Sequence, residues 1–147
     1  MGRWDITCSS IMKTKFCLMA VITAFSLIVM TSCTTSEVII EAEVQAAQRQ
    51  CPQDLGNGLT LTKVENDARY VIYYYNADET LYSFSQSMVT DAQKEQIIST
   101  LQAQAATRSE VQRFVKALQD ANKGLIYHYF TSSTNMDIVV EARELRY

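Results

Sequence analysis

The sequence predicts an α+β fold: a four-stranded antiparallel sheet, made of two hairpins, with helices packed on one face. Two observations support this prediction. Stretches with a helical spacing of apolar residues alternate with short stretches rich in β-branched and aromatic residues. Their order along the chain is one helix, two strands, two helices and two strands, or α-ββ-αα-ββ. The length of 147 residues, 48% of them hydrophobic and 20% charged, suits one globular domain.

The first helix and the first hairpin fill the N-terminal half of this domain. Residues 36–49 have a helical apolar spacing, and glutamates gather in their first half, as suits a helix N-terminus. A glycine-rich turn follows this segment. Residues 59–64 and 69–76 are rich in β-branched and aromatic residues, and the short polar turn between them predicts a hairpin.

Two helices are predicted next, each from a capping-box pattern. Thr90 and Gln93 are spaced as in a capping box, which would open a helix that ends near residue 105. Thr107 and Glu110 have the same spacing and precede a regular amphipathic stripe. We therefore expect two consecutive helices between the hairpins.

The second hairpin is predicted after the Lys123-Gly124 pair, which is typical of a helix C-terminus. Its strands are residues 125–131 and 137–142. Residues 119–125 (QDANKGL) also match residues 53–59 (QDLGNGL) at four of seven positions. Two interpretations stay open: a duplicated helix–hairpin unit, or chance identity.

The charge distribution excludes several partners. From Cys33 onward the chain has ten basic and fifteen acidic residues. An acidic domain is a poor match for the phosphate backbone of nucleic acid, so no nucleic-acid partner is expected. The chain also lacks the basic cluster that docks proteins on anionic lipid.

Residues 12–33 (MKTKFCLMAVITAFSLIVMTSC) have the composition of an export signal. Lys13 and Lys15 precede an uncharged apolar run of about 15 residues, which is shorter than the roughly 20 that span a bilayer. Small residues then lead to Cys33. The segment resembles a bacterial lipoprotein signal peptide, with Met30-Thr31-Ser32-Cys33 as its lipobox, although leucine is usual where Met30 stands. The other interpretations are an uncleaved signal anchor and a plain secretory signal.

This resemblance implies cleavage before Cys33 and acylation of that residue, so that lipid on Cys33 anchors the protein to the membrane. Thr34 stands where many inner-membrane lipoproteins of Gram-negative bacteria have aspartate, which favours the outer membrane. Whether the domain faces the periplasm or the cell surface is left open. Met12, followed by Lys-Thr-Lys, is a better start than Met1.

The expected organisation is therefore a signal peptide (1–32), a lipidated cysteine with a short tether (33–36) and a single α+β domain (37–147). The tether reaches on the order of 10 Å, which keeps the domain close to the bilayer. Cys51 is the one remaining cysteine after Cys33, so the mature domain has no internal disulfide, and we expect Cys51 to pack at a helix end.

Aromatic side chains dominate the predicted strands. Tyr73 and Tyr75 are two residues apart on one predicted strand, and His128 and Phe130 are two apart on another, so each pair shares a face. We take these four residues as a possible binding face. Two interpretations stay open: one row forms the core while the other lies on a partly covered face, or the aromatic residues form an exposed platform for a glycan or a protein.

No catalytic, cofactor or metal pattern stands out. His128 is the single histidine, and it has no cysteine or acidic neighbours at a metal-binding spacing. The predicted function is thus a non-catalytic, lipid-anchored envelope protein that binds an envelope protein or a glycan. The alternatives are a small envelope hydrolase that uses His128 or a carboxylate pair, and a lipoprotein inhibitor or immunity protein.

Overall fold

The computed structural model describes residues 35–145, which form a sheet with helices packed against it. The predicted signal peptide and Cys33 lie outside the described residues. In chain order the elements are α2 (Ser36–Gln50), β1 (Gln53–Asp54), β2 (Leu59–Asn66), β3 (Tyr70–Ala77), the 3-10 helix η2 (Gln86–Met88), α3 (Asp91–Thr107), α4 (Ser109–Asp120), β4 (Gly124–Phe130), β5 (Asn135–Val140) and the 3-10 helix η3 (Ala142–Glu144).

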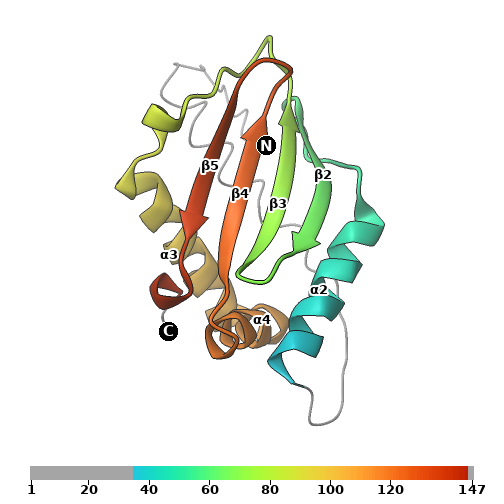
Figure 1. Ribbon diagram of the computed structural model, residues 1–147, viewed down its shortest axis with the longest axis vertical. Helices are drawn as coiled ribbons and strands as arrows, with labels where there is room; N and C mark the ends of the chain where they lie inside the picture. The colour runs from blue at the N-terminus through green and yellow to red at the C-terminus, as the bar shows by residue number, and fades with distance from the viewer. Residues whose placement is uncertain (1–34, 146–147) are drawn as a thin grey trace, which may run out of the picture.

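The sheet has five strands in the order β1-β2-β3-β4-β5 (Figure 1). Strands β2 and β3 form one antiparallel hairpin and β4 and β5 the other, as predicted. The prediction of a four-stranded, wholly antiparallel sheet is wrong in two respects. The short strand β1 adds to the outer edge of β2, and the central strands β3 and β4 run parallel. The α+β class is confirmed.

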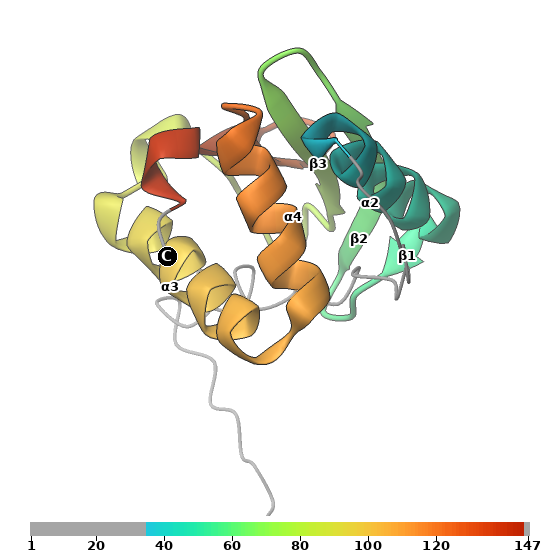
Figure 2. The same ribbon diagram turned by 90° about the horizontal axis from the view of Figure 1, so that it is seen from below.

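The parallel pairing follows from the way the two middle helices are laid out. With 17 residues, α3 is about 25 Å long, close to the length of an eight-residue strand. It therefore carries the chain from the end of β3 back towards the level of its start. Helix α4 does not return along α3 but crosses beneath the sheet, between α3 and α2 (Figure 2). Strand β4 thus starts at the same end as β3.

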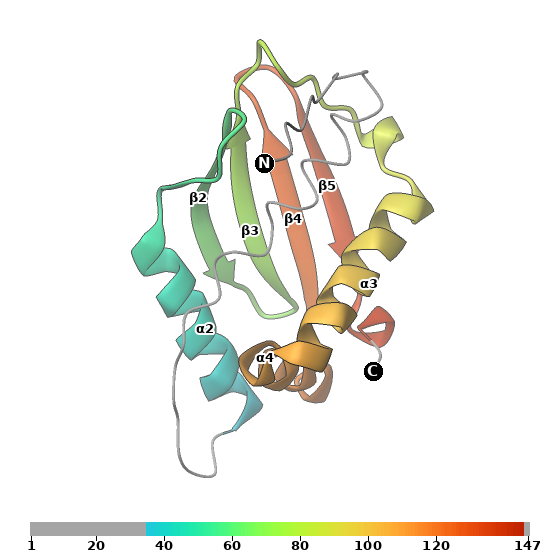
Figure 3. The same cartoon turned by 180° about the vertical axis from the view of Figure 1, so that it is seen from behind.

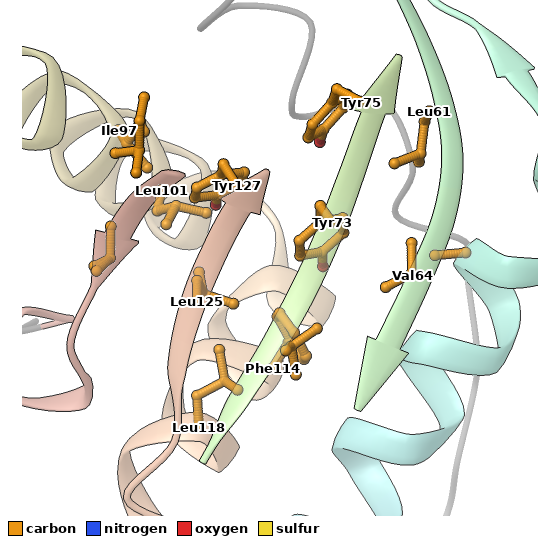
Figure 4. Packing of buried hydrophobic residues seen from close by; sticks show 14 of the residues in the cluster. Leu61, Val64, Tyr73, Tyr75, Ile97, Leu101, Phe114, Leu118, Leu125 and Tyr127 are labelled. Atoms are coloured by element: carbon orange, nitrogen blue, oxygen red, sulfur yellow. The ribbon is translucent and has the colours of Figure 1, made fainter. Parts of the chain in front are cut away.

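The helices pack together on one side of the sheet, where α2 lies alongside the edge strand β2 and α3 lies beside β5 (Figure 3). The strands turn every second side chain towards them, and these side chains meet the apolar faces of the helices in one core (Figure 4). The strand residues of this core include Leu61, Val64, Val71, Tyr73, Tyr75, Leu125, Tyr127, Tyr129, Ile138 and Val140. The described part of the predicted 37–147 domain therefore shares a single core.

Helix boundaries confirm one capping prediction and correct another. Thr90 and Gln93 form the predicted capping box at the start of α3. Thr107 instead bonds through its hydroxyl to carbonyl groups in the last turn of α3, and Arg108 occupies the N-cap position of α4. Because α3 ends at Thr107 and α4 begins at Ser109, Thr107 is the last residue of α3 and does not cap α4.

Helix α4 ends at Asp120, before the Lys123-Gly124 pair that was predicted to end it. Asn122 adopts a left-handed conformation with φ of 54°, and the next amide, that of Lys123, donates to the carbonyl of Leu118. Gly124 already belongs to β4, where a Cβ atom would lie 2.5 Å from the carbonyl oxygen of Val140. This glycine is required by close packing of the backbone and not by the helix end.

The two similar sequence stretches adopt different structures. Residues 53–59 form β1 and the turn into β2, whereas residues 119–125 form the end of α4 and the start of β4. Gly58 has a positive φ of 74° and lies in a turn, while Gly124 is buried in a strand. The structure therefore favours chance identity over a duplicated unit.

Candidate binding surface

The face of the sheet turned away from the helices carries a continuous set of apolar and aromatic side chains, which we call the open face. Each is half-buried by its neighbours and otherwise reaches solvent. The members of the open face are Tyr70, Ile72, Tyr74, Ile126, His128, Phe130 and Val139. Register brings them into rows across the strands, because Ile72 lies beside Ile126 and Tyr74 beside His128.

The centre of the open face is an aromatic cluster. The ring of His128 meets Tyr74 edge-on, with 5.4 Å between ring centroids, and stacks on Phe130 at 5.6 Å. These contacts come from the parallel pair β3 and β4. They fix the three rings as a shallow apolar platform with polar atoms at its margin.

A histidine–aspartate pair borders this platform. His128 Nδ1 lies 2.5 Å from a carboxylate oxygen of Asp137, which is directly opposite on β5. The contact holds the imidazole in one orientation. Among residues 35–145 there is no group of three or more His, Cys, Asp or Glu side chains that could hold a metal ion.

A second carboxylate, Glu65, borders the platform on the other side. The hydroxyl of Tyr74 donates to Glu65 at 2.7 Å, and this hydrogen bond is the main reason that the pKa of Tyr74 rises to about 12. Glu65 also pairs with Lys63, whose ammonium lies 5.6 Å from the centre of the Tyr74 ring. Hydrogen bonds from Lys63 and Tyr74 lower the pKa of Glu65, so Glu65 is ionised at neutral pH and forms an ion pair with Lys63 at this margin of the open face.

The predicted binding residues do not share one face. His128 and Phe130 lie on the open face, but Tyr73 and Tyr75 point to the helices and are only 8% and 1% exposed. They stack there on Tyr127 and Tyr129 of β4, with 5.6 Å and 4.9 Å between ring centroids. The open-face partner of His128 is Tyr74, because the parallel register pairs these two residues. Tyr73 and Tyr75 are therefore core residues, and their assignment to the binding face is corrected.

A groove of about 810 Å³ adjoins the open face at the edge of the sheet. It lies between α2 and the β2–β3 hairpin, and Glu65, Ile72 and Tyr74 belong to both the groove and the open face or its margin. Its other lining residues are Glu41, Val44, Gln45, Gln48, Arg49, Val64, Asn66 and Asp67. We call it the edge groove.

The remaining candidate, Cys51, does not join this surface. It caps the C-terminus of α2, its Sγ lies 3.4 Å from the carbonyl oxygen of Ala47, and it packs against the core. Burial raises the pKa of its thiol, which opposes formation of the nucleophilic thiolate. Cys51 is therefore a packing residue at a helix end.

Comparison with protein-family models, with curated proteins and with solved structures gave no significant match. Within the described residues, none of the helices has the length and apolar character needed to cross a membrane. The geometry of the open face and the edge groove is therefore the basis for assigning a function.

Proposed function

We propose that the protein is a lipid-anchored protein of the bacterial envelope that binds another envelope protein through the open face of its sheet. The observation that carries this proposal is the aromatic platform of Tyr74, His128 and Phe130. Helices cover one face of the sheet, while the apolar side chains of the other stay half-exposed. Such a surface is stabilised when a partner removes it from water.

Binding fits the position of His128 better than catalysis does. A hydrolase needs a nucleophile or activated water held beside its base in a concave site. His128 has an aspartate to orient it, yet it lies between two aromatic rings on the open face of the sheet. The edge groove does not include it. Asp137 at one side and Glu65 at the other give the platform a polar rim, as in a protein interface.

Anchorage rests on the lipobox resemblance at Cys33 and on the distance from that cysteine to the domain. Helix α2 begins at Ser36, so two residues separate the lipidated position from the first turn of the helix. The lower end of the domain in Figure 1, where α2 begins, would then lie close to the bilayer. Cys33→Ala is expected to abolish metabolic labelling with palmitate and to leave an unprocessed precursor; unchanged labelling would exclude lipidation.

The test of partner binding is affinity purification of the tagged, lipidated protein from detergent-solubilised membranes, with mass spectrometry of what is retained. We expect a stoichiometric protein partner that is lost from Ile126→Glu, which places a charge in the middle of the open face. Val38→Glu is the matched control, because Val38 is an exposed apolar residue of α2, a helix that packs on β2 and α4. Equal retention by both variants would contradict the proposal.

A glycan ligand or an enzyme to be inhibited are the other occupants of the same face. A glycan would be recognised by binding of soluble cell-wall fragments to the isolated protein, with loss of binding in Ile126→Glu. An inhibitor would retain an active enzyme and lower its activity on addition. Either result would keep the open face as the binding site but replace the partner named here.

A further inference from the structure

The edge groove is a hollowed site beside the open face. Its volume of about 810 Å³ lies within the range of roughly 300–1,000 Å³ that is usual for small-molecule sites. Val44, Val64 and Ile72 line it with apolar surface, to which the ring of Tyr74 adds. The groove can therefore hold a compact ligand against apolar side chains.

Contacts between α2 and β2 set the depth of this groove. The backbone N–H of Val64 donates to the side-chain oxygen of Gln48 at 2.7 Å, and the carboxamide of Asn66 donates to Glu41 at 3.0 Å. These bonds join the helix to the strand. A ligand in the groove lies along the outside of them, so both bonds stay in place and neither element has to move.

The polar side chains of the groove belong to one hydrogen-bonded network. Glu41 accepts from Gln45 as well as from Asn66, both at 3.0 Å. The side-chain oxygen of Asn66 accepts in turn from the buried ammonium of Lys123 at 2.8 Å. Because these bonds already orient the carboxylate and the carboxamides, a ligand that meets them loses less affinity to the ordering of side chains.

The charges of the groove are partly compensated. Glu65 forms an ion pair with Lys63, and Arg49 places a guanidinium in the same lining as Glu41 and Asp67. The groove therefore does not favour an ion of one sign. Its carboxylates, carboxamides and guanidinium instead suit an uncharged ligand with many hydroxyl and amide groups, which can both donate and accept hydrogen bonds.

An amino sugar has the chemical groups that this lining matches. The C–H groups of a sugar ring form apolar patches, and its hydroxyl groups lie around the edge of the ring. An acetamido substituent adds a methyl group beside an N–H donor and a carbonyl acceptor. The groove offers the same combination, because the carboxamides of Gln45 and Gln48 lie one turn apart on α2, next to the apolar Val44.

We propose that the edge groove binds an uncharged oligosaccharide that contains N-acetylated amino sugars. Val44 and Ile72 contact the C–H groups and the acetamido methyl group. Gln45 and Glu41 form hydrogen bonds with the hydroxyl and acetamido groups, and Arg49 donates to sugar oxygens. This inference goes beyond the proposed function, because the protein partner binds the open face whereas the saccharide binds the groove.

The test is isothermal titration calorimetry of the full chain, held in detergent micelles, with chitotetraose, an uncharged chain of N-acetylglucosamine. Cellotetraose is the matched ligand, because it has the same length and linkage but no acetamido groups. We expect saturable binding of chitotetraose and binding of cellotetraose that is weaker by about tenfold or more, since the groups that meet the acetamido substituent stay unpaired. No binding of chitotetraose, or equal affinity for both sugars, would overturn the inference.

Substitutions at Gln45 locate the site. Gln45 is exposed on α2, so Gln45→Trp places an indole over the groove without entering the core, and it should weaken chitotetraose binding by about tenfold or more. Gln45→Ala removes hydrogen bonds only and should weaken it about twofold to tenfold. Gln102→Trp, at an exposed glutamine of α3, is the matched control and should leave the affinity unchanged. Equal affinities of Gln45→Trp and Gln102→Trp would contradict a site in the groove.

A measurement on the unsubstituted protein keeps the inference testable if Gln45→Trp does not fold. In NMR spectra, chitotetraose should shift the backbone amide signals of Gln45 and Val64 more than that of Phe130. Shifts centred on Phe130, or binding that is lost in Ile126→Glu and kept in Gln45→Trp, would place the saccharide on the open face and overturn the inference. Chitotetraose binding that depends on Gln45 supports the groove site, whatever protein the membrane purification retains.

Discussion

The two faces of the sheet use the same residue type in opposite ways. Tyrosines on the covered face, such as Tyr73 and Tyr127, lie stacked in the core and are 8% and 1% exposed. On the open face, the hydroxyls of Tyr70 and Tyr74 donate to carboxylates, at 3.1 Å to Glu141 and 2.7 Å to Glu65, and the rings stay half-exposed. The covered rings therefore stabilise the fold, while the open rings form a surface whose orientation is fixed by polar contacts.

The largest expected effect separates two adjacent residues of β4. Tyr127→Ala removes a fully buried ring and should lower the free energy of unfolding by about 3 to 5 kcal/mol. His128→Ala, on the open face, should lower it by about 1 kcal/mol or less. Urea denaturation followed by circular dichroism measures both. Similar losses for the two variants would mean that the open face belongs to the core.

The next largest effect on the free energy of unfolding is expected at Lys123, a buried lysine. Lys123 is 5% exposed, and its ammonium donates to the side chain of Asn66 at 2.8 Å and to the carbonyl of Asp67 at 2.9 Å. Lys123→Ala leaves these groups without their donor and should cost about 2 kcal/mol. Lys116→Ala breaks only an exposed pair with Asp120 and should cost about 0.5 kcal/mol or less. Equal midpoints in urea for the two variants would contradict this role.

The pKa values of carboxyl groups also differ between the helices and the open face. Burial, with a smaller contribution from Glu110, raises the pKa of Glu43 on α2 to about 7. In the unfolded chain this carboxyl loses its proton near pH 4.5, so its contribution to stability is complete below pH 4.5 and is lost as the pH rises through about 7.

Glu43→Gln removes that loss. The variant should be more stable than the wild type by about 1 to 2 kcal/mol at pH 8.5, after allowance for solvent screening of the exposed part of the side chain, and no more stable at pH 4. Urea titrations at the two pH values measure the difference, with Glu95→Gln as an exposed control on α3. A gain that does not change with pH would rule out titration of Glu43 as its cause.

The smallest effect concerns the rim of the open face. Because the hydrogen bond to Glu65 is the main cause of the raised pKa of Tyr74, Glu65→Gln should move that pKa from about 12 towards the ordinary value of 10. The change in stability should stay below about 1 kcal/mol. Carbon-13 NMR of the tyrosine ring follows the titration. An unchanged pKa would show that Glu65 does not hold the Tyr74 hydroxyl.

Local patterns in the sequence predicted the elements well, because helix and strand periodicity depends on neighbouring residues. The hairpins and the capping box at Thr90 belong to this class. The parallel pairing of β3 and β4 was not predictable in this way. It depends on α4 crossing beneath the sheet instead of returning along α3, which is set by packing between distant elements.

The candidate surface shows the same limit. His128 and Phe130 share a face, as their spacing predicts, because residues two apart on a strand point to the same side. The row of β3 that meets His128 depends on the register between β3 and β4, so spacing along β3 alone does not distinguish Tyr74 from Tyr73 and Tyr75. Asp137 was missed as the partner of His128, although the register of the β4–β5 hairpin would have indicated it.

The most direct test of the central claim is photo-crosslinking in living cells, with p-benzoylphenylalanine at one position at a time. At Phe130, on the open face, we expect a discrete crosslinked adduct with a single envelope protein. At Glu95, exposed on α3 on the helical side, we expect no such adduct. An adduct at Glu95 without one at Phe130 would contradict the assignment of the open face as the binding surface.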